Sequence, residues 1–544
     1  MRARPAVHAP STAHPYPDST DRRIAHDWLT MSVSKQTQGR APARALPSTE
    51  PPAASMPAAH ENRRLAGTTL ALGFRQVVSW GTATVAMVFI PRHLGPLDFG
   101  LLATATAIGG YVALFAGAGL NQVLTQRAAR DPGSARALFR AVTKTRMALM
   151  LVVTPMALGV GFAVFDRRIG YVLLLSVLVK WALDLVSGAV TAIMQGQHRL
   201  GPITMLHSVM IVVSQAAIVA GLAAGFGLWA PIVVGPIWST IVLVLTIPLF
   251  ARAREFPARR DLPGPGMSEL LRAGLPFLAF ETANTIFGFS DVMLLAFLTD
   301  PTIVGSYTFA WRLSAFIVLP ASILGSALLP TLTVAPGRDP TYGRRLPRIA
   351  IKMVLLFAVP AAFGIALLAP AITVLVGGHE FASSGTALRI LAMAVPLTTI
   401  GVILGTNAQA TGRQRDLAFI SWGAVALNVG ANLAVIPMAQ HYFGDGGIGA
   451  AATTVLTEVY MTGAILVISR GTISAGDILT AAWRPVVASA LMAGVLVAVG
   501  GLLPLLALIA VGAATYGLCA LAVRATSLAE LKGMLSTVRA RGGA

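Results

Sequence analysis

The fold is decided by a stretch near the start of the apolar part of the chain, Ile90–Gln126, which reads IPRHLGPLDFGLLATATAIGGYVALFAGAGLNQVLTQ. A polar turn with two prolines leads into a run of about 20 apolar and small residues, the length of helix that crosses a bilayer. Similar runs recur almost to the end of the 544-residue chain, which is 55% hydrophobic and only 12% charged. Soluble domains carry roughly a quarter charged residues. The sequence therefore predicts a polytopic membrane protein.

Fourteen membrane spans follow one another from Leu65 onward. We predict helices because a helix satisfies its own backbone groups in lipid. The expected spans are 65–90, 100–122, 147–165, 169–193, 202–225, 229–250, 273–298, 303–330, 349–370, 385–408, 416–438, 447–469, 483–502 and 503–523. Only Pro504 separates the last two, which leaves open whether they form one span or two.

The chain is expected to divide into four parts. Residues 1–64 are rich in Pro, Ala, Ser and Thr and predict a disordered basic tail. Met31 and Met56 are alternative start sites within it. Residues 65–272 and 273–470 each form a six-helix bundle, and residues 471–544 add two helices and a short tail.

The distribution of Lys and Arg orients the spans. With the N-terminus inside, both chain ends and every second loop hold nearly all of the 41 Lys and Arg residues, as the positive-inside rule requires. The opposite loops hold only Arg92, Arg167 and Arg168, and the spans hold Arg75, Lys180, Arg312 and Arg389. Both termini are therefore predicted to be cytoplasmic. The net charge of +19 sets topology, and we expect no nucleic-acid partner.

The two halves of the chain are similar to each other. Ile90–Gln126 matches Phe297–Thr333 at an offset near 205, so that Gly100 corresponds to Gly305. Because each repeat has six helices, both repeats have the same orientation across the membrane. Repeats of this kind place a substrate path at their interface.

The same stretch, with several later pieces, resembles bacterial polysaccharide transporters, the Wzx-type (O-antigen) flippases of the multidrug/oligosaccharidyl-lipid/polysaccharide superfamily. The later pieces are FSDVMLLAF around Asp291, Gly305–Arg312 (GSYTFAWR), Asn407–Gly412 (NAQATG), Asn428–Asn432 with Pro437, and Gly446–Ala452 (GGIGAAA). The resemblance implies an all-α fold of fourteen, or twelve plus two, helices in a V-shaped transporter like MATE and MurJ proteins. It also implies a bacterial inner-membrane flippase that moves a polyprenyl-diphosphate-linked oligosaccharide outward by alternating access.

Ionisable side chains inside the spans are the candidate functional residues, because charges at mid-membrane are costly and usually functional. Arginine pairs with phosphate oxygens in a bidentate manner, which suits a lipid diphosphate. The candidates for diphosphate binding are Arg75, Arg312, Lys180 and Arg389. Arg389 lies near an interface and can snorkel, and Lys180 can instead neutralise Asp184 one turn away.

Buried carboxylates suit reversible protonation or Na⁺ binding, so an ion gradient is expected to drive transport. The coupling candidates are Glu281, Asp291, Asp184 and Glu458. Glu281 and Asp291 share a polar seam with Asn284 on one helix, and both are alternatively structural partners of the arginines. The candidates for saccharide contact are Asn284, Asn407, Asn428 and Asn432, although intramembrane Asn pairs also serve as interhelical contacts.

Other function classes are weighed against this hypothesis. A multidrug exporter would need an acidic, aromatic cavity, whereas a lipid II flippase shares the anionic cargo. A membrane saccharide polymerase or ligase would need catalytic groups in a large outer loop, and the longest outer segment, 371–384, offers only His379 and Glu380. We therefore expect no enzyme. Cys519 is the single cysteine, no GxxxxGK[ST] loop occurs, and neither a metal site nor a cofactor other than H⁺ or Na⁺ is expected. Partners are the lipid-linked oligosaccharide, membrane lipid and other polysaccharide-assembly membrane proteins.

Overall fold

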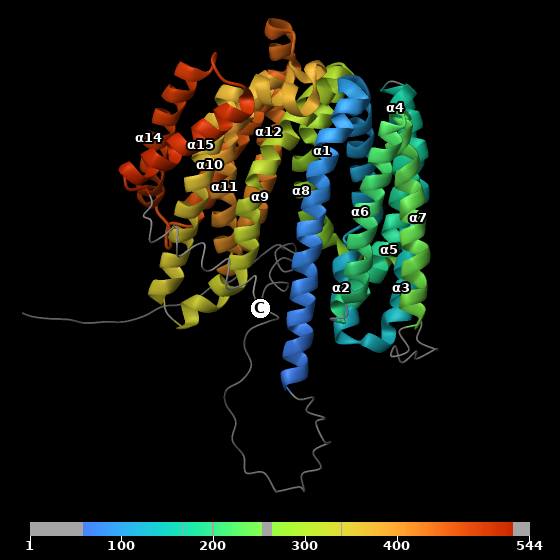
Figure 1. The fold of residues 1–544 in the computed structure, drawn as a ribbon. Coiled ribbons are helices and arrows are strands. Elements are labelled where there is room, and N and C mark those ends of the chain that lie inside the picture. The colour runs from blue at the N-terminus through green and yellow to red at the C-terminus, as the bar shows by residue number, and fades with distance from the viewer. Residues whose placement is uncertain (1–57, 166, 198–200, 253–263, 339, 526–544) are drawn as a thin grey trace, which may run out of the picture. The chain divides into compact units, whose positions relative to one another are not determined.

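The computed structural model describes residues 58–165, 167–197, 201–252, 264–338 and 340–525, and these residues form helices without any strand (Figure 1). Most of the predicted tail lies outside them, but residues 58–64 belong to the first helix. All the side chains discussed below belong to the compact unit Glu61–Ala544.

The N-terminal half consists of the elements from α1 to α7. They are α1 (Ala58–Gly117), α2 (Leu120–Arg130), the short η1 (Pro132–Ser134), α3 (Ala135–Ala163), α4 (Arg167–Val172), the π-helical turn η2 (Leu173–Leu178), α5 (Val179–Gly196), α6 (Gly201–Ala223) and α7 (Trp229–Arg252). Helix α5 packs on α2, α3 and α7, and α6 packs on α7. Apolar residues of α2, α3 and α5, including Leu120, Val142 and Ile193, form the fully buried core between them.

The C-terminal half is built around α11. Its elements are α8 (Met267–Leu298), α9 (Pro301–Arg338), α10 (Pro340–Gly377), η3 (His379–Phe381), α11 (Ser384–Ala410), α12 (Gln414–Phe443), α13 (Gly446–Ile468), α14 (Ala475–Val499) and α15 (Leu505–Ala522). Helix α11 packs on α9, α10 and α13, while α12 packs on both α13 and α8. Helix α8 also contacts α2, which connects the two halves.

The helices follow the expected spans in order, with three differences. Helix α1 contains the first two spans and is kinked at Gly95, whose φ is 70°, between Pro91 and Pro96. Twelve helices among the described residues are long and apolar enough to cross a membrane. Helix α8 is 32 residues long but carries the predicted polar seam, which lowers its hydropathy.

The third difference corrects the expected loop at 123–146. Helix α3 begins at Ala135, so Arg146 lies inside a helix and is only 1% exposed. Counting charges placed it in a basic loop because Arg140 and Lys144 precede it closely.

Two glycines bring the halves into backbone contact. A Cβ atom placed on Gly100 would lie 1.8 Å from the Pro301 carbonyl oxygen, and one on Gly305 would lie 1.9 Å from the Pro96 carbonyl oxygen. Pro96 and Pro301 are separated by the same offset as Gly100 and Gly305. The contact is therefore reciprocal under the repeat register that the sequence predicts.

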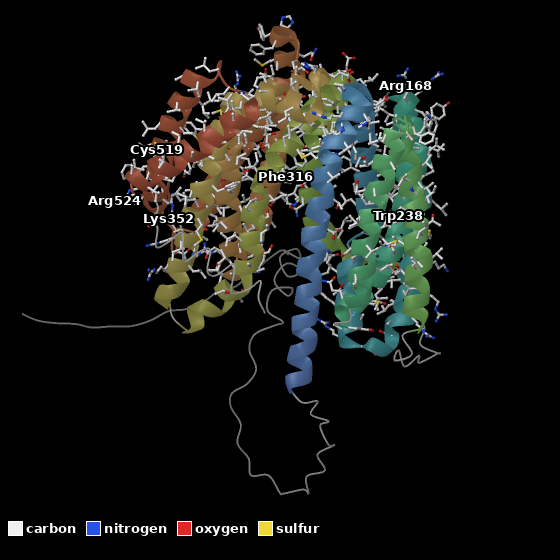
Figure 2. All side chains as sticks on the ribbon, in the orientation of Figure 1. Arg168, Trp238, Phe316, Lys352, Cys519 and Arg524 are labelled. Carbon is white, nitrogen blue, oxygen red and sulfur yellow. The ribbon has the colours of Figure 1, made fainter. Side chains whose placement is uncertain are left out.

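The last two helices form separate spans. Helices α14 and α15 pack on each other and on α10, and the Tyr516 hydroxyl on α15 donates to the Leu356 carbonyl at 2.7 Å. Between α10, α14 and α15 lies an apolar cavity of about 440 Å³. Cys519 lies on α15 (Figure 2) and is a free, half-buried thiol.

Candidate functional site

Asp291 is the centre of a buried hydrogen-bond network. It lies on α8 and is 9% exposed. Its Oδ1 accepts from the amides of Asn432 at 2.7 Å and Asn428 at 3.1 Å, both on α12. Its Oδ2 accepts from the hydroxyls of Tyr307 on α9 at 2.5 Å and Thr454 on α13 at 2.9 Å. Four helices therefore converge on one carboxyl group.

All four donors to Asp291 are uncharged. No Lys or Arg forms an ion pair with it among the described residues, so the alternative in which it pairs with Arg312 is not found; the side chain of Arg75 lies outside the described residues. Further oxygen atoms lie around the carboxylate, since Ser290 donates to Asn428 Oδ1 at 2.7 Å and Asn432 Oδ1 is buried with no partner in the described part of the chain. Carboxylate, amide and hydroxyl oxygens suit hard cations. The network has the chemistry to hold a proton or a small hard cation.

Asn428 and Asn432 form interhelical contacts, which the sequence offered as the alternative to saccharide binding. They are 1% and 0% exposed and bind Asp291 rather than facing an open cavity. Tyr307 and Thr454 are the partners that the sequence did not reveal, because one lies in an apolar run and the other is one of many span threonines.

Glu281 lies on the same helix as Asp291 but contacts the other half of the chain. Its Oε1 accepts from Gln122 Nε2 on α2 at 2.6 Å. The adjacent Asn121 accepts from the buried guanidinium of Arg146 at 2.9 Å, and the same guanidinium donates to the Leu185 carbonyl at 2.8 Å. The predicted polar seam of α8 therefore faces different neighbours along its length.

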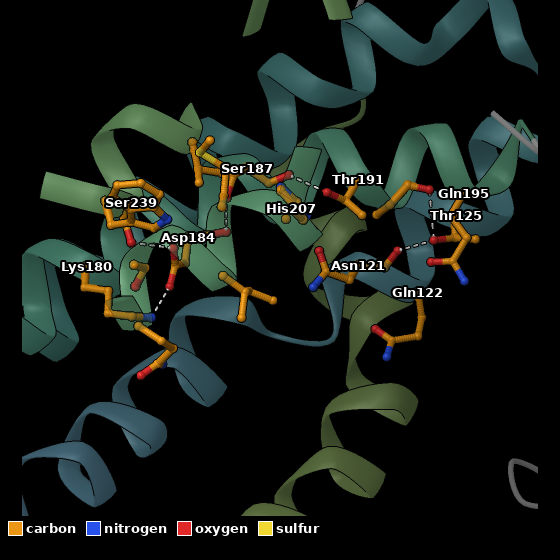
Figure 3. A pocket seen from close by; sticks show the side chains of 18 of the residues that line it. Asn121, Gln122, Thr125, Lys180, Asp184, Ser187, Thr191, Gln195, His207 and Ser239 are labelled. Atoms are coloured by element: carbon orange, nitrogen blue, oxygen red, sulfur yellow. Dashed lines mark hydrogen bonds and ion pairs between the residues drawn. The ribbon is translucent and has the colours of Figure 1, made fainter. Parts of the chain in front are cut away.

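A polar cavity of about 740 Å³, here called the N-terminal cavity, lies between α2, α5, α6 and α7. Figure 3 shows side chains of α2 and α5, with His207 from α6 and Ser239 from α7, around it. Its walls are rich in amides and hydroxyls, including Asn121, Gln122, Thr191, Gln195, Ser214 and Gln215. This site could not be predicted from the sequence, because single Gln and Ser residues in separate spans show no pattern until the helices pack.

Lys180 and Asp184 form an ion pair on the wall of the N-terminal cavity. Asp184 also accepts from the Ser239 hydroxyl at 2.9 Å, and the Lys180 ammonium lies 4.9 Å from the Trp181 ring centre. The alternative in which these two residues neutralise each other therefore has direct geometric support.

A second polar cavity, here called the C-terminal cavity, has a volume of about 530 Å³ and contains two more candidates. Asn284 and the buried Glu458 both line it, together with Thr398, Ser421 and Gln409. Its walls come from α8, α9, α11, α12 and α13. Each half of the chain thus contains a polar cavity among its membrane helices.

The three predicted diphosphate ligands whose side chains are described, Lys180, Arg312 and Arg389, contact different neighbours. Arg312 on α9 lies with its guanidinium 4.9 Å from the ring centre of Phe99 on α1, and no carboxylate pairs with it among the described residues. Arg389 is exposed and donates to the Ala366 carbonyl at 3.0 Å. Arg75 lies in α1 at a position whose side chain is outside those described.

Three further residues that the sequence singled out lie away from these sites. Asn407 donates to the Thr472 hydroxyl at 3.0 Å, beside the turn between α13 and α14. The outer segment 371–384 is largely helical, since α10 runs to Gly377 and η3 includes both His379 and Glu380. Among the described residues, no group of three or more His, Cys, Asp or Glu side chains is placed to hold a metal ion.

Membrane helices in two related halves, with buried polar sites in each half, define a membrane transporter. The chain belongs to the polysaccharide biosynthesis protein family, which matches residues 89–386. It is 23% identical over 413 residues to the probable low-salt glycan biosynthesis flippase Agl15 of Haloferax volcanii, covering 72% of this chain and 81% of that protein.

Solved structures show the same fold. The chain is similar to the lipid II flippase MurJ in an inward closed conformation, with a TM-score of 0.66, 13% identity and coverage of 84% of this chain and 98% of MurJ. It is also similar to the inward-facing conformation of a multidrug resistance MATE family transporter of the MOP superfamily. That match has a TM-score of 0.57 and 17% identity, and covers 74% of this chain and 97% of the transporter. The expected relationship to polysaccharide biosynthesis proteins and the all-α fold shared with MurJ and MATE transporters are confirmed.

Proposed function

We propose that the chain is a flippase that moves a polyprenyl-diphosphate-linked oligosaccharide outward across the bacterial cytoplasmic membrane. The cargo would serve surface polysaccharide synthesis, as O-antigen, exopolysaccharide or capsule, with both termini of the chain in the cytoplasm. The observation that carries the proposal is the N-terminal cavity, because a 740 Å³ space lined by amides and hydroxyls inside a membrane bundle is a site for a polar headgroup.

Arg312 is the side chain best placed to take the diphosphate. Its positive charge has no carboxylate partner among the described residues, and it lies where α9 of one half meets α1 of the other. An arginine fork matches phosphate oxygens in a bidentate manner. Arg75 on the same helix as Phe99 is its proposed counterpart from the N-terminal half.

Asp291 is the proposed coupling site, and the ion is H⁺ or Na⁺. Binding of either ion would remove the negative charge that four helices now stabilise. An ion can drive transport only if it binds two conformations with different affinity. The convergence of α8, α9, α12 and α13 on one carboxyl gives such a difference a physical origin, since any relative movement of these helices changes the number of donors.

Transport by the purified chain in liposomes tests the proposal. A fluorescent polyprenyl-diphosphate trisaccharide is supplied in one leaflet, and a lectin reports its arrival in the other under an imposed H⁺ or Na⁺ gradient. We expect gradient-dependent transfer that Asp291→Asn abolishes while binding of the lipid is retained. Transfer that Asp291→Asn leaves fully gradient-dependent would overturn the coupling role. Efflux of a cationic dye without lipid transfer would overturn the flippase function.

A further inference from the structure

We propose that the N-terminal cavity binds the saccharide part of the cargo and selects sugars that carry no charge. This inference rests on the proposed function, since it assumes that a lipid-linked saccharide is what the chain moves. It assigns the cavity a ligand class, an uncharged oligosaccharide, and separates that part of the site from the arginine proposed for the diphosphate.

The charges around the N-terminal cavity cancel. Two charged side chains on its wall, Lys180 and Asp184, are bonded to each other. Two more lie one contact behind the wall, where Arg146 bonds to Asn121 and Glu281 bonds to Gln122. These four groups are two cations and two carboxylates. The only other titratable residue among those that line the cavity is His207.

Several polar groups on the wall have hydrogen-bonding capacity left. Gln122 Oε1, Gln215 Oε1 and Trp238 Nε1 have no partner among the described residues; each is covered in this conformation, and a rotation of its side chain would turn it toward a ligand. The amide of Asn121 accepts from Arg146 through Oδ1, which leaves its Nδ2 hydrogens to donate. Thr191 donates to the Ser187 carbonyl, so its hydroxyl oxygen can still accept.

This set of groups fits a polyhydroxylated ligand. Both donors and acceptors are present, and each sugar hydroxyl can donate and accept at once. Trp238 adds an apolar face beside its N–H group. The cavity volume of 740 Å³ lies within the range of roughly 300–1,000 Å³ that is typical of ligand pockets.

The negative charge of an acidic sugar would meet no free cation in the N-terminal cavity. Lys180 is paired with Asp184, and the Arg146 guanidinium already donates to Asn121 and to the Leu185 carbonyl, while Asp184 and Glu281 add negative potential. A carboxylate that gives up hydration on binding and meets no free cation loses more solvation energy than it regains. A uronate in the saccharide would therefore weaken binding, although the diphosphate, held elsewhere, would be unaffected.

A matched pair of lipids tests the selection. The full chain in detergent is mixed with undecaprenyl-diphosphate trisaccharides of glucose, galactose, mannose or N-acetylglucosamine units, or with the same lipids after oxidation of one hexose at C6 to a uronate. Native mass spectrometry reports the bound fraction. We expect at least one uncharged lipid to bind about tenfold or more tightly than its oxidised form, a difference of about 1.4 kcal/mol. Equal or tighter binding of every oxidised form would overturn this inference alone.

Two substitutions at Gln215 locate the effect in the N-terminal cavity. Gln215→Leu removes an unpaired acceptor and should lower affinity for the uncharged lipid about tenfold. Gln215→Lys adds a cation and should shift preference toward the oxidised lipid. Gln409→Leu, in the C-terminal cavity, is the matched control and should leave both affinities unchanged.

The failures of the two proposals are distinguishable. If no saccharide lipid binds any better than undecaprenyl diphosphate without sugar, this inference is overturned. If none of the saccharide lipids is transported in liposomes either, the proposed function is overturned as well. If the uncharged lipids bind but Gln215→Leu and Gln409→Leu behave alike, the saccharide site is not the N-terminal cavity.

Discussion

Gly100 and Gly305 face each other so closely that neither position has room for a methyl group. The nearest atom to a Cβ on Gly100 is a carbonyl oxygen of α9, and the nearest to a Cβ on Gly305 is a carbonyl oxygen of α1. Both contacts involve backbone, which cannot rotate away as a flexible side chain would. The two halves thus touch at equivalent positions of the repeat.

Alanine at either of these glycines should destabilise the protein. Overpacking typically costs about 1–3 kcal/mol, and the upper end is expected here because the clashing atoms are backbone. The measurement is the midpoint of thermal unfolding of the purified chain in detergent, followed by size-exclusion chromatography. Gly463→Ala on α13 is the control, since a Cβ there meets nothing within 4 Å. Equal midpoints for the Gly100→Ala, Gly305→Ala and Gly463→Ala variants would contradict the close contact.

Tyr307→Phe should have a graded effect on ion coupling. It removes one of four donors to Asp291 while keeping the ring in the core. A hydrogen bond to a charged group is worth about 1.5–3 kcal/mol, so the affinity of the carboxylate for a proton or Na⁺ should rise. We expect the ion concentration at half-maximal transport to fall by about tenfold or more. Ser290→Ala is a milder comparison, because Ser290 bonds to Asn428 rather than to Asp291. An unchanged ion dependence in Tyr307→Phe would contradict the role of the network.

Arg312→Ala should abolish export of surface polysaccharide while the protein stays inserted and folded. Arg312→Lys keeps the charge but loses the planar fork, so partial export is expected. The readout is surface polysaccharide in cells that depend on the variant, with protein amount measured by immunoblot. Arg415→Ala is the control, because that exposed arginine lies against Phe419 in the first turns of α12. Normal export by Arg312→Ala would rule out its contact with the diphosphate.

Removing either member of the Lys180–Asp184 pair should do more harm than removing both. Lys180→Met or Asp184→Leu leaves a single charge on the cavity wall, whereas the double variant restores neutrality. The side chains are 43% and 33% exposed, so the expected cost of each single change is about 1 kcal/mol or less. The unfolding midpoints of the wild type, both single variants and the double variant form a complete mutant cycle. Additive losses would show that the two charges do not interact.

Asp445 should make stability depend on pH at the start of α13. Its side chain caps this helix by accepting from the Gly447 amide at 2.8 Å, so Asp445→Ala should cost about 1 kcal/mol while Asp445→Asn keeps the cap. Burial raises the pKa of Asp445 above 3.8, although hydrogen bonds from the Gly447 and Ile448 amides act to lower it.

Because the folded pKa of Asp445 is higher than the unfolded one, the folded state binds the proton more tightly. This group therefore favours folding more as the pH falls through its folded pKa, and its contribution becomes constant below the unfolded pKa. Wild type should gain stability relative to Asp445→Asn as the pH is lowered from about 7 toward about 4. Parallel unfolding midpoints for the two proteins across this range would contradict the shifted pKa.

Local sequence patterns predicted the helices well because length and hydropathy are properties of one segment. The expected spans follow the observed helices in order, and the polar seam of α8 was visible from its spacing. The turn expected between the first two spans lies at the kink in α1, where Pro91 and Pro96 flank Gly95. The π-helical turn η2 was not predicted, because five of the six residues in Leu173–Leu178 are apolar and none is Gly or Pro.

The partners of the polar side chains could not be predicted, because they come from other helices. Asn428 and Asn432 stood out by their spacing of one turn, yet only packing of α12 on α8 shows that they bind Asp291. Arg146 looked like a loop residue among basic neighbours until α2 and α5 covered it. Tyr307 carried no signal, since a tyrosine in an apolar span is ordinarily a packing residue.

Helix α8 connects the Asp291 network to the N-terminal cavity. Asp291 and Glu281 are ten residues apart on it, which is about 15 Å of helix. One bonds to α9, α12 and α13, and the other holds Gln122 on the wall of the N-terminal cavity. Because α8 is a continuous helix, a tilt or rotation at the Asp291 end also moves the Glu281 end. If a change in the charge of Asp291 moves α8, the affinity of the N-terminal cavity for a sugar must change as well. By thermodynamic reciprocity, a bound sugar must then change the affinity of the Asp291 carboxyl for its ion.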